Sequence, residues 1–411
     1  MLTVAWVSPF APDRSGGGGQ IRQAHLLLAL ARQASIRLVC PGPITDPAVA
    51  EAVTAVVDAS PGDGWRDRHP WRRRVADVAA ALGSRRPMEV RAFAPVRRSV
   101  GAALADPAGQ AADLVLVEFA GLAPLVPPAR SVPWVLTLHN LPSRMAAQQA
   151  AVMPRRRQRW LLRRDARIAG AFERQMAARF DAVITTTAED AAALAGADEA
   201  LASRILVMPN GTDVDRLAPS PVPTAARVVF TGALYTTPNV DGATWFCHHV
   251  LPAIREAQPA VEVDIVGARP TAAVSQLGRL PGVSVHPDVA DIAPFLAAAR
   301  VAVVPIRVGS GSRLKALEAM AAGRPVVGTT VGLEGLGIVP GVEALVADDA
   351  AAFAAAVVRL LGDDDVAGPL AQAGRVAAEQ RFAWPAIADQ FAAAMVEIAE
   401  RSAAGAAAGP A

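Results

Sequence analysis

The chain has 411 residues, of which 52% are apolar and only 19% are charged. This composition excludes an intrinsically disordered protein, and the length exceeds what one ordinary core accommodates, so two domains are expected. No run of 18 uncharged apolar residues occurs, so no membrane-spanning helix is expected. The N-terminal segment MLTVAWVSPFAP lacks the basic start of a signal peptide, and Cys40 and Cys247 are too few for a disulfide framework or a metal site. A cytoplasmic setting is therefore expected.

The net charge of +2 hides an asymmetry between the two halves of the chain. Residues 1–180 contain 25 Arg against 13 Asp and Glu, whereas residues 181–411 contain 15 Arg and Lys against 25 Asp and Glu. The balance is thus +12 in the first half and −10 in the second, which favours two domains with different partners. The basic half suits phosphate, anionic lipid or an acidic polymer; alternatively, the two surfaces attract each other across a cleft.

Short apolar segments typical of buried strands alternate with helical segments along the chain. This alternation occurs twice and predicts an α/β protein with two doubly wound, Rossmann-like domains. The expected strands lie at residues 2–10, 35–42, 113–120, 134–140 and 180–187, and then at residues 226–234, 261–268, 283–288, 301–306 and 324–330.

The segment 207–227 is dense in Pro, Gly, Asn and Asp, which predicts a domain boundary there. We therefore assign residues 1–206 to an N-terminal domain and residues 207–384 to a C-terminal domain. The Ala- and Gly-rich tail at 403–411 is expected to be disordered.

The loop after the strand at 301–306 carries the clearest chemical signal. Gly309 and Gly311 allow the backbone to approach a ligand, and Ser310 or Ser312 suits the N-cap of the next helix. A helix N-terminus binds anions, so Arg313 and Lys315 in its first turn are locally unfavourable unless a phosphate lies beside them.

Lys315 is the only lysine among 40 basic residues, and Glu318 follows one turn later, where a carboxylate can accept both hydroxyls of a ribose. The alternative is a solvated helix face on which these charges form an ordinary ion pair.

Five segments resemble the family 4 glycosyltransferases, which have the GT-B fold. They are SPFAPDRSGGGGQIRQAHLLLAL (8–30), LTLHN (136–140), VMPNGTDVDRL (207–217), VVFTGAL (228–234) and GSGSRLKALEAMAAGRPVVGTTVGLEGL (309–336). The resemblance covers nearly the whole chain and implies two domains facing a cleft.

The resemblance also implies roles for residues that bind a nucleotide-diphosphate sugar. Glu318 matches the second glutamate of the family's Glu-x7-Glu motif and is expected to bind the donor ribose. Lys315 and Arg313 are expected to hold the donor diphosphate, which Gly17 and Gly18 approach from the other domain.

His139 is expected beside the transferred sugar, although a buried histidine bonded to a carbonyl is the alternative. Gly232 lies in the expected donor loop. In the same loop Tyr235, the only tyrosine, either contacts the donor or packs on the next helix. Asn239 and Asp241 are expected to fix the turn of that loop. The C-terminal helix, at about 385–402, is expected to pack back on the N-terminal domain.

The sequence departs from the family at two places. Ser310 stands where the first glutamate of the motif is expected, which leaves the donor sugar open. The loop GALYTTPNVDG (232–242) has no basic residue, so Arg313 and Lys315 are the expected counter-charges of the diphosphate. A lysine here, in a chain of arginines, suggests a crowded pocket that admits a compact point charge.

The segment Arg155–Arg167 contains seven arginines together with Trp160, Leu161 and Leu162. Such a basic amphipathic segment suits peripheral contact with an anionic membrane, and solvated surface arginine is the alternative. The acceptor is unknown, with a lipid-linked molecule among the candidates. No nucleic-acid-binding fold motif occurs, so no nucleic-acid partner is expected.

The resemblance thus implies sugar transfer from a nucleotide-diphosphate sugar to an acceptor hydroxyl, with retention and with no metal or other cofactor. Such a transferase would act in glycan, glycolipid or glycosylated-metabolite synthesis, in the cytoplasm or on the inner membrane face. One alternative is a sugar-nucleotide epimerase of the same fold, for which Glu118 is the strand-end acid of the first domain. Another is a catalytically inactive protein that binds a nucleotide sugar or another transferase.

Overall fold

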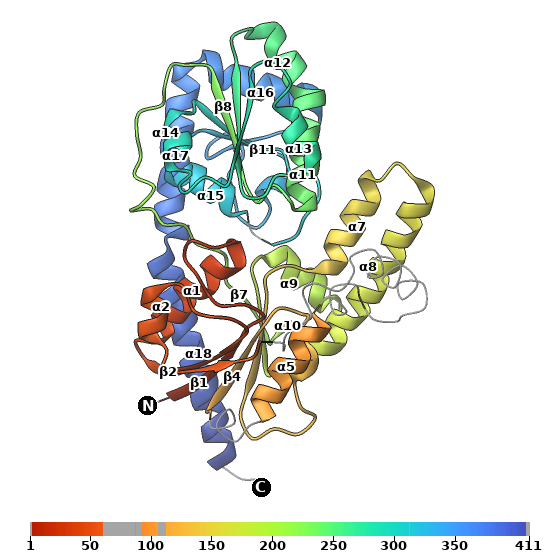
Figure 1. Cartoon of the computed structure of the whole chain (residues 1–411), viewed down its shortest axis with the longest axis vertical. Coiled ribbons are helices and arrows are strands. Elements are labelled where there is room, and N and C mark those ends of the chain that lie inside the picture. Colours follow the sequence, from red (N-terminus) through yellow and green to blue (C-terminus); the bar gives the residue numbers. More distant parts are fainter. Residues whose placement is uncertain (1, 61–86, 88–92, 106–111, 312, 408–411) are drawn as a thin grey trace. The chain divides into compact units, whose positions relative to one another are not determined.

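The computed structural model of the protein is shown in Figure 1 and describes residues 2–60, 87, 93–105, 112–311 and 313–407. The chain forms two compact units. Unit 1 comprises residues 1–208 and 387–411, and unit 2 comprises residues 209–386. The first division lies next to the domain boundary expected from the Pro- and Gly-rich segment.

Unit 1 is built on a parallel sheet of seven strands in the order β3-β2-β1-β4-β5-β6-β7. The central strands are buried along nearly their whole length, which explains their continuous apolar sequences. The strands are β1 (Leu2–Val7), β2 (Ala34–Cys40), β3 (Ala55–Asp58), β4 (Leu114–Glu118), β5 (Trp134–Leu138), β6 (Ala182–Thr185) and β7 (Ile205–Val207).

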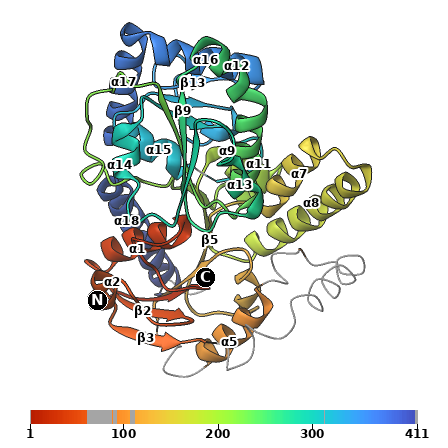
Figure 2. The same ribbon diagram turned by 45° about the horizontal axis from the view of Figure 1, so that its top comes forward.

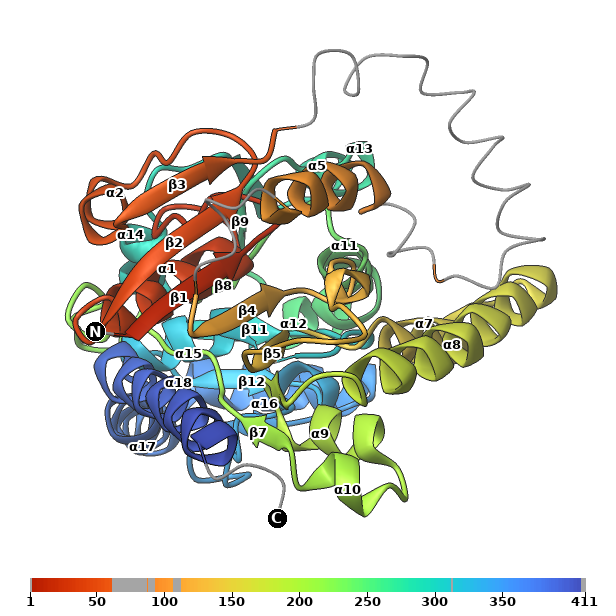
Figure 3. The same ribbon diagram turned by 90° about the horizontal axis from the view of Figure 1, so that it is seen from below.

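Helices cover both faces of this sheet, and α7 and α8 lie side by side as a hairpin (Figure 3). The last helix, α18 (Trp384–Ala407), packs on β1, where the rings of Phe391 and Trp6 lie 5.8 Å apart. The other helices are α1 (Gly18–Leu30), α2 (Pro47–Ala52), α5 (Ala94–Ala105), α7 (Pro142–Val152), α8 (Arg156–Ala177), α9 (Ala188–Ala195) and α10 (Glu199–Ala202), with a 3-10 turn at Ala123–Leu125.

Unit 2 is built on a parallel sheet of six strands in the order β10-β9-β8-β11-β12-β13. The order steps outward from the centre in both directions, as in doubly wound folds that bind ligands at the carboxyl ends of their strands. The strands are β8 (Arg227–Thr231), β9 (Glu262–Gly267), β10 (Val283–Pro287), β11 (Val301–Val304), β12 (Val326–Gly328) and β13 (Leu345–Val346).

Helices α11, α12 and α13 lie on one side of this sheet, and α14, α15 and α17 lie on the opposite side (Figures 1 and 2). Helix α15 buries Ala316, Leu317, Ala319 and Met320 in the core, so its first turn is held rigidly at the sheet edge. The helices are α11 (Thr237–Trp245), α12 (Leu251–Ala257), α13 (Ala272–Leu277), α14 (Ala293–Ala298), α15 (Leu314–Ala321), α16 (Ala350–Gly362) and α17 (Asp364–Phe382), with short helical turns at Phe246–Val250 and Val331–Leu333.

The C-terminal tail corrects one expectation. Residues 403–407 are helical, because α18 continues through Ala407 where disorder was predicted from residue 403. Alanine has the highest helix propensity, so an Ala-rich low-complexity segment attached to an anchored helix extends that helix.

Candidate functional site

A buried cluster in unit 2 connects Lys315 with the loop after β8. The ammonium of Lys315 donates to Oδ1 of Asn239 at 2.6 Å, and the amide of Asn239 donates to the carbonyl oxygen of Ala233 at 2.9 Å. Gly232 has a φ of 150°, and a Cβ there would lie 2.8 Å from the Asn239 amide nitrogen and 3.0 Å from Lys315 Nζ. Glycine is therefore required at this position for the lysine to reach its partner.

The environment of Lys315 lowers its pKa. Burial, together with the smaller effect of the Arg313 charge, lowers the pKa of Lys315 to about 7, and Glu318 opposes the shift. The ammonium also lies 5.3 Å from the centre of the Phe230 ring. A bound anion would supply the negative charge that this site lacks.

Arg313 contacts the backbone of the glycine loop. Its guanidinium donates to the carbonyl oxygens of Ser310 at 2.8 Å, Gly311 at 2.9 Å and Val331 at 3.2 Å. A Cβ at Gly309, whose φ is 155°, would lie 2.7 Å from this guanidinium. Arg313 thus braces the glycine loop from within.

Arg313 also occupies the N-cap position of α15, which corrects the expectation that Ser310 or Ser312 is the N-cap. Ser310 is buried, with 7% of its surface exposed. Ser312 lies outside the described residues. Helix α15 begins at Leu314, directly after Arg313, whose side chain donates to the carbonyls of the preceding turn.

Glu318 lies one turn after Lys315 and is partly buried. Burial raises the pKa of the Glu318 carboxyl, and the charges of Arg216 and Lys315 oppose that shift. A half-desolvated carboxylate of this kind is a strong acceptor for hydroxyl groups.

Tyr235 is 45% exposed and stands beside an open groove of about 500 Å³ on unit 2. The guanidinium of Arg269 lies 3.8 Å from the centre of its ring. Across the groove, Arg307 forms a two-pronged ion pair with Asp241 at 2.7 and 3.0 Å. Both arginines follow strand ends, but the sequence analysis assigned a role to neither of them.

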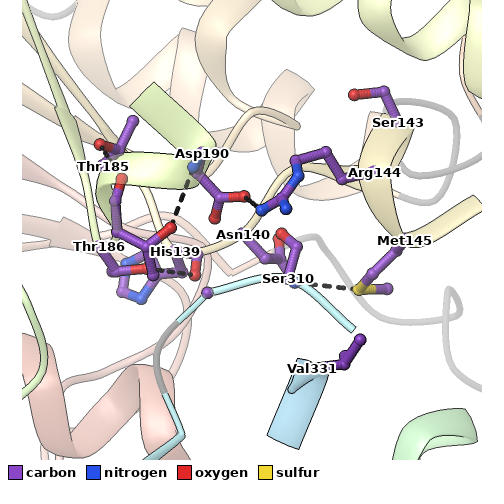
Figure 4. A network of polar contacts seen from close by, with 12 residues as sticks. His139, Asn140, Ser143, Arg144, Met145, Thr185, Thr186, Asp190, Ser310 and Val331 are labelled. Atoms are coloured by element: carbon purple, nitrogen blue, oxygen red, sulfur yellow. Dashed lines mark hydrogen bonds and ion pairs between the residues drawn. The ribbon is translucent and has the colours of Figure 1, made fainter. Parts of the chain in front are cut away.

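His139 follows β5 in unit 1 and is held by a residue from the neighbouring strand. Its Nε2 lies 2.6 Å from Oε2 of Glu118, the last residue of β4. Because β4 and β5 are parallel and adjacent, their carboxyl ends bring the two side chains together. The His139 carbonyl accepts from the Thr186 hydroxyl at 3.3 Å (Figure 4).

Phe119 stacks flat on the imidazole of His139, with ring centres 4.0 Å apart and planes 2° from parallel. Its φ of 70° is rare for a residue with a side chain. Such backbone strain persists where the surrounding structure fixes a functional geometry.

The glycine loop at the start of α1 lies beside this pair. Gly17 is the N-cap of α1, and its N–H donates to the side-chain oxygen of Gln20 at 3.1 Å, while Gly18 is the first residue of the helix. Gly19, which sequence reasoning missed, is the glycine nearest to His139. A Cβ there would lie 3.0 Å from the Phe119 ring and 3.7 Å from Nδ1 of His139.

The segment after His139 is anchored by polar contacts, several of which appear in Figure 4. Arg144 pairs with the buried Asp190, and the backbone N–H of Ser143 donates to Glu173 at 2.8 Å. Burial raises the pKa of Glu173. These contacts fix the direction in which the chain leaves β5.

Three further observations concern the described residues alone. They contain no group of three or more His, Cys, Asp or Glu side chains placed to hold a metal ion. None of their helices combines the length and apolar character needed to cross a membrane. Cys40 and Cys247 are both buried thiols, and burial raises their pKa to about 12.

Both units match family models of known proteins. Residues 16–216 match the family model described as Glycosyltransferase Family 4, and residues 225–363 match the model described as Glycosyl transferases group 1. The chain is 33% identical over 256 residues to a D-inositol 3-phosphate glycosyltransferase of Xylanimonas cellulosilytica, covering 55% of this chain and 58% of that protein. It is 30% identical over 303 residues to the protein of the same name from Geodermatophilus obscurus, covering 67% of this chain and 63% of that protein. In each case the match spans less than two thirds of the relative.

Solved structures share the fold over nearly the full length. Sucrose-phosphate synthase of Thermosynechococcus elongatus gives a TM-score of 0.72 at 19% identity, covering 97% of this chain and 99% of that one. Anabaena Alr3699/HepE, solved with UDP and glucose, gives a TM-score of 0.65 at 15% identity, covering 97% and 100%. Since the two family models match most of both units and the two Rossmann-like sheets are those of the GT-B fold, the chain belongs to the family 4 glycosyltransferases.

Proposed function

We propose that the protein transfers a sugar from a nucleotide-diphosphate sugar to an acceptor hydroxyl, with retention of anomeric configuration. The observation that carries this proposal is the cluster of Lys315, Asn239 and Gly232 in unit 2. It presents the partly buried ammonium of Lys315 at the carboxyl edge of a doubly wound sheet, next to Gly232, where a side chain would crowd it.

The donor diphosphate would bind to Lys315 and to the backbone of the glycine loop. Arg313 would act by holding that loop in shape, since its guanidinium already binds three loop and turn carbonyls. Glu318 would accept the ribose hydroxyls, and Tyr235 with Arg269 would lie near the base. Anabaena Alr3699/HepE, a structural relative solved with UDP and with UDP-glucose, makes a uridine nucleotide the first donor to test.

The leaving diphosphate would be stabilised by fixed positive groups alone, without a metal or other cofactor. Transition-state stabilisation by preorganised charges suits this chemistry, because the developing negative charge falls on the diphosphate. His139 would contact the transferred sugar, and the loop of Gly17 and Gly18 would approach the donor diphosphate.

The acceptor is proposed to reside at an anionic membrane surface, which the start of α8 would contact. Trp160 is 60% exposed and Leu161 is 40% exposed, although both are large and apolar. They stand among the seven arginines of Arg155–Arg167, with Asp165 as the single acid. Exposed aromatic and aliphatic groups within a basic helix are typical of interfacial segments.

Product analysis tests the proposal against its two alternatives. The protein would be incubated with UDP-glucose and a panel of polyol, sugar and lipid-linked acceptors, and the products separated by mass spectrometry and NMR. A glycosylated acceptor with the donor's anomeric configuration supports the proposal. An epimerised donor identifies an isomerase, and binding without turnover identifies an inactive partner protein.

A further inference from the structure

The carboxylate behind His139 has no part in the function as described so far. Glu118 has no solvent exposure, and one of its oxygens lies 2.6 Å from Nε2 of His139. An ionised carboxylate placed so deeply costs several kcal/mol unless charges and hydrogen bonds compensate it, so its retention calls for an explanation.

Arg22 provides the compensating charge. It is fully buried in α1, and its guanidinium donates to the carbonyl oxygen of Met208 at 2.8 Å. Burial lowers the pKa of Arg22 to about 10, and the negative charge of Glu118 opposes that shift. Arg22 therefore remains a cation at neutral pH and supplies positive charge that acts on Glu118 through the buried interior.

A carboxylate only accepts hydrogen bonds, and this fixes the imidazole. Nε2 must carry the proton that Glu118 accepts, and in the neutral imidazole Nδ1 is then the unprotonated nitrogen. Nδ1 lies on the side of Gly19, where a Cβ would come within 3.7 Å. The flat contact with Phe119 opposes rotation of the imidazole about its Cβ–Cγ bond.

We propose that Glu118 is a positioning residue that holds His139 as the Nε2–H tautomer, so that Nδ1 presents a lone pair to a ligand hydroxyl over Gly19. Nδ1 would then accept a hydrogen bond from a hydroxyl of the sugar. This inference rests on the proposed function for the identity of the ligand, but the tautomer itself follows from the geometry of unit 1.

Nitrogen NMR of protein labelled with ¹⁵N-histidine tests the tautomer without any activity. The ring signal that is lost in His139→Gln belongs to His139, and in wild type this signal should show a protonated Nε2 and an unprotonated Nδ1. Glu118→Ala should convert the ring to a mixture of tautomers, whereas Glu118→Gln should keep Nε2–H, because its amide oxygen still accepts. An unchanged ring in Glu118→Ala, or a protonated Nδ1 in wild type, would overturn the proposal.

Kinetics on the same variants separate positioning from folding. Glu118→Ala should lower kcat about 10- to 100-fold, the size of effect expected from losing one hydrogen bond to a charged group. Glu118→Gln should recover most of that loss, and the affinity of both variants for UDP, which lacks the sugar, should match wild type. Equal loss in both variants would contradict positioning through the hydrogen bond. If wild type transfers no sugar, the proposed function fails, yet the NMR result still decides the role of Glu118.

Discussion

The ammonium of Lys315 donates a 2.6 Å hydrogen bond to the side-chain oxygen of Asn239, a residue 76 positions earlier in the chain. The bond joins the start of α15 to the start of α11 across the carboxyl edge of the unit 2 sheet. Since a neutral amide cannot balance the charge, the lysine is held in place but is not neutralised. The ammonium of Lys315 is therefore held in one place and can still bind an anion.

The affinity for a nucleotide sugar should therefore depend on pH. In the free protein Lys315 loses its proton at a pKa of about 7, and a bound diphosphate favours the ammonium. Below pH 7 the lysine is already charged, so binding is strongest there. Above pH 7 binding must take up a proton, and affinity should fall by up to about tenfold per pH unit. Calorimetric titration of UDP-glucose in buffers of different ionisation enthalpy measures this proton uptake. Lys315→Met should bind weakly at every pH, and a pH-independent wild type would contradict the account.

Lys315→Arg should lower turnover although it keeps the charge. Gly232 leaves about 3.0 Å between its Cβ position and Nζ, and a planar guanidinium is larger and more rigidly directed than an ammonium. Steady-state kinetics would show the loss, with Arg359→Lys on the exposed face of α16 as a control that leaves the rate unchanged. A fully active Lys315→Arg would show that the site does not discriminate between the two cations.

Gly232→Ala should destabilise unit 2. The new Cβ would lie 2.8 Å from Asn239 in a backbone conformation with φ of 150°, which ordinary side chains avoid. The expected cost is about 1–3 kcal/mol of unfolding free energy, seen as a lower Tm. Gly368→Ala provides the matched control. No atom lies within 4 Å of its Cβ position in α17, so it should be neutral or stabilising.

The basic start of α8 should bind anionic membranes. Flotation with vesicles of phosphatidylcholine and phosphatidylserine should carry the protein, and the binding should fade as salt is raised, because salt shortens the reach of the arginine charges. Trp160→Ala should reduce flotation, whereas Val342→Ala, at an exposed valine of unit 2, should not. Equal binding to vesicles of phosphatidylcholine alone would contradict an electrostatic surface.

Local sequence was sufficient to predict the buried strands and the glycine loops. β4 and β5 are apolar apart from Glu118 and Thr137 because both their faces are covered, and that pattern is visible without a structure. The strands β3, β7 and β13 are short and partly exposed, and the sequence analysis did not predict them. Helix α15 was predicted, but its N-cap was not, because the bracing by Arg313 involves a carbonyl at Val331 beyond the helix itself.

The site contacts that the sequence did not predict share one property, which is that the two partners are distant in the chain. Asn239 was expected to fix a turn, and it does bind Ala233, but its bond to Lys315 depends on two loops meeting. Glu118 was noted as a strand-end acid, yet its pairing with His139 appears only when β4 and β5 lie side by side. Such partnerships follow from the strand order, which the sequence does not reveal locally.

The claim that unit 2 holds a nucleotide-diphosphate site is tested most directly by thermal unfolding with UDP, other nucleoside diphosphates and UDP-glucose. Wild type, Glu318→Ala and the exposed control Glu256→Ala would be compared. A ligand at one hundred times its Kd should stabilise the folded protein by about 2.7 kcal/mol. The account predicts a rise in Tm with one nucleoside diphosphate for wild type and Glu256→Ala, and a much smaller rise for Glu318→Ala. No rise with any nucleotide, or an equal rise in all three proteins, would contradict it.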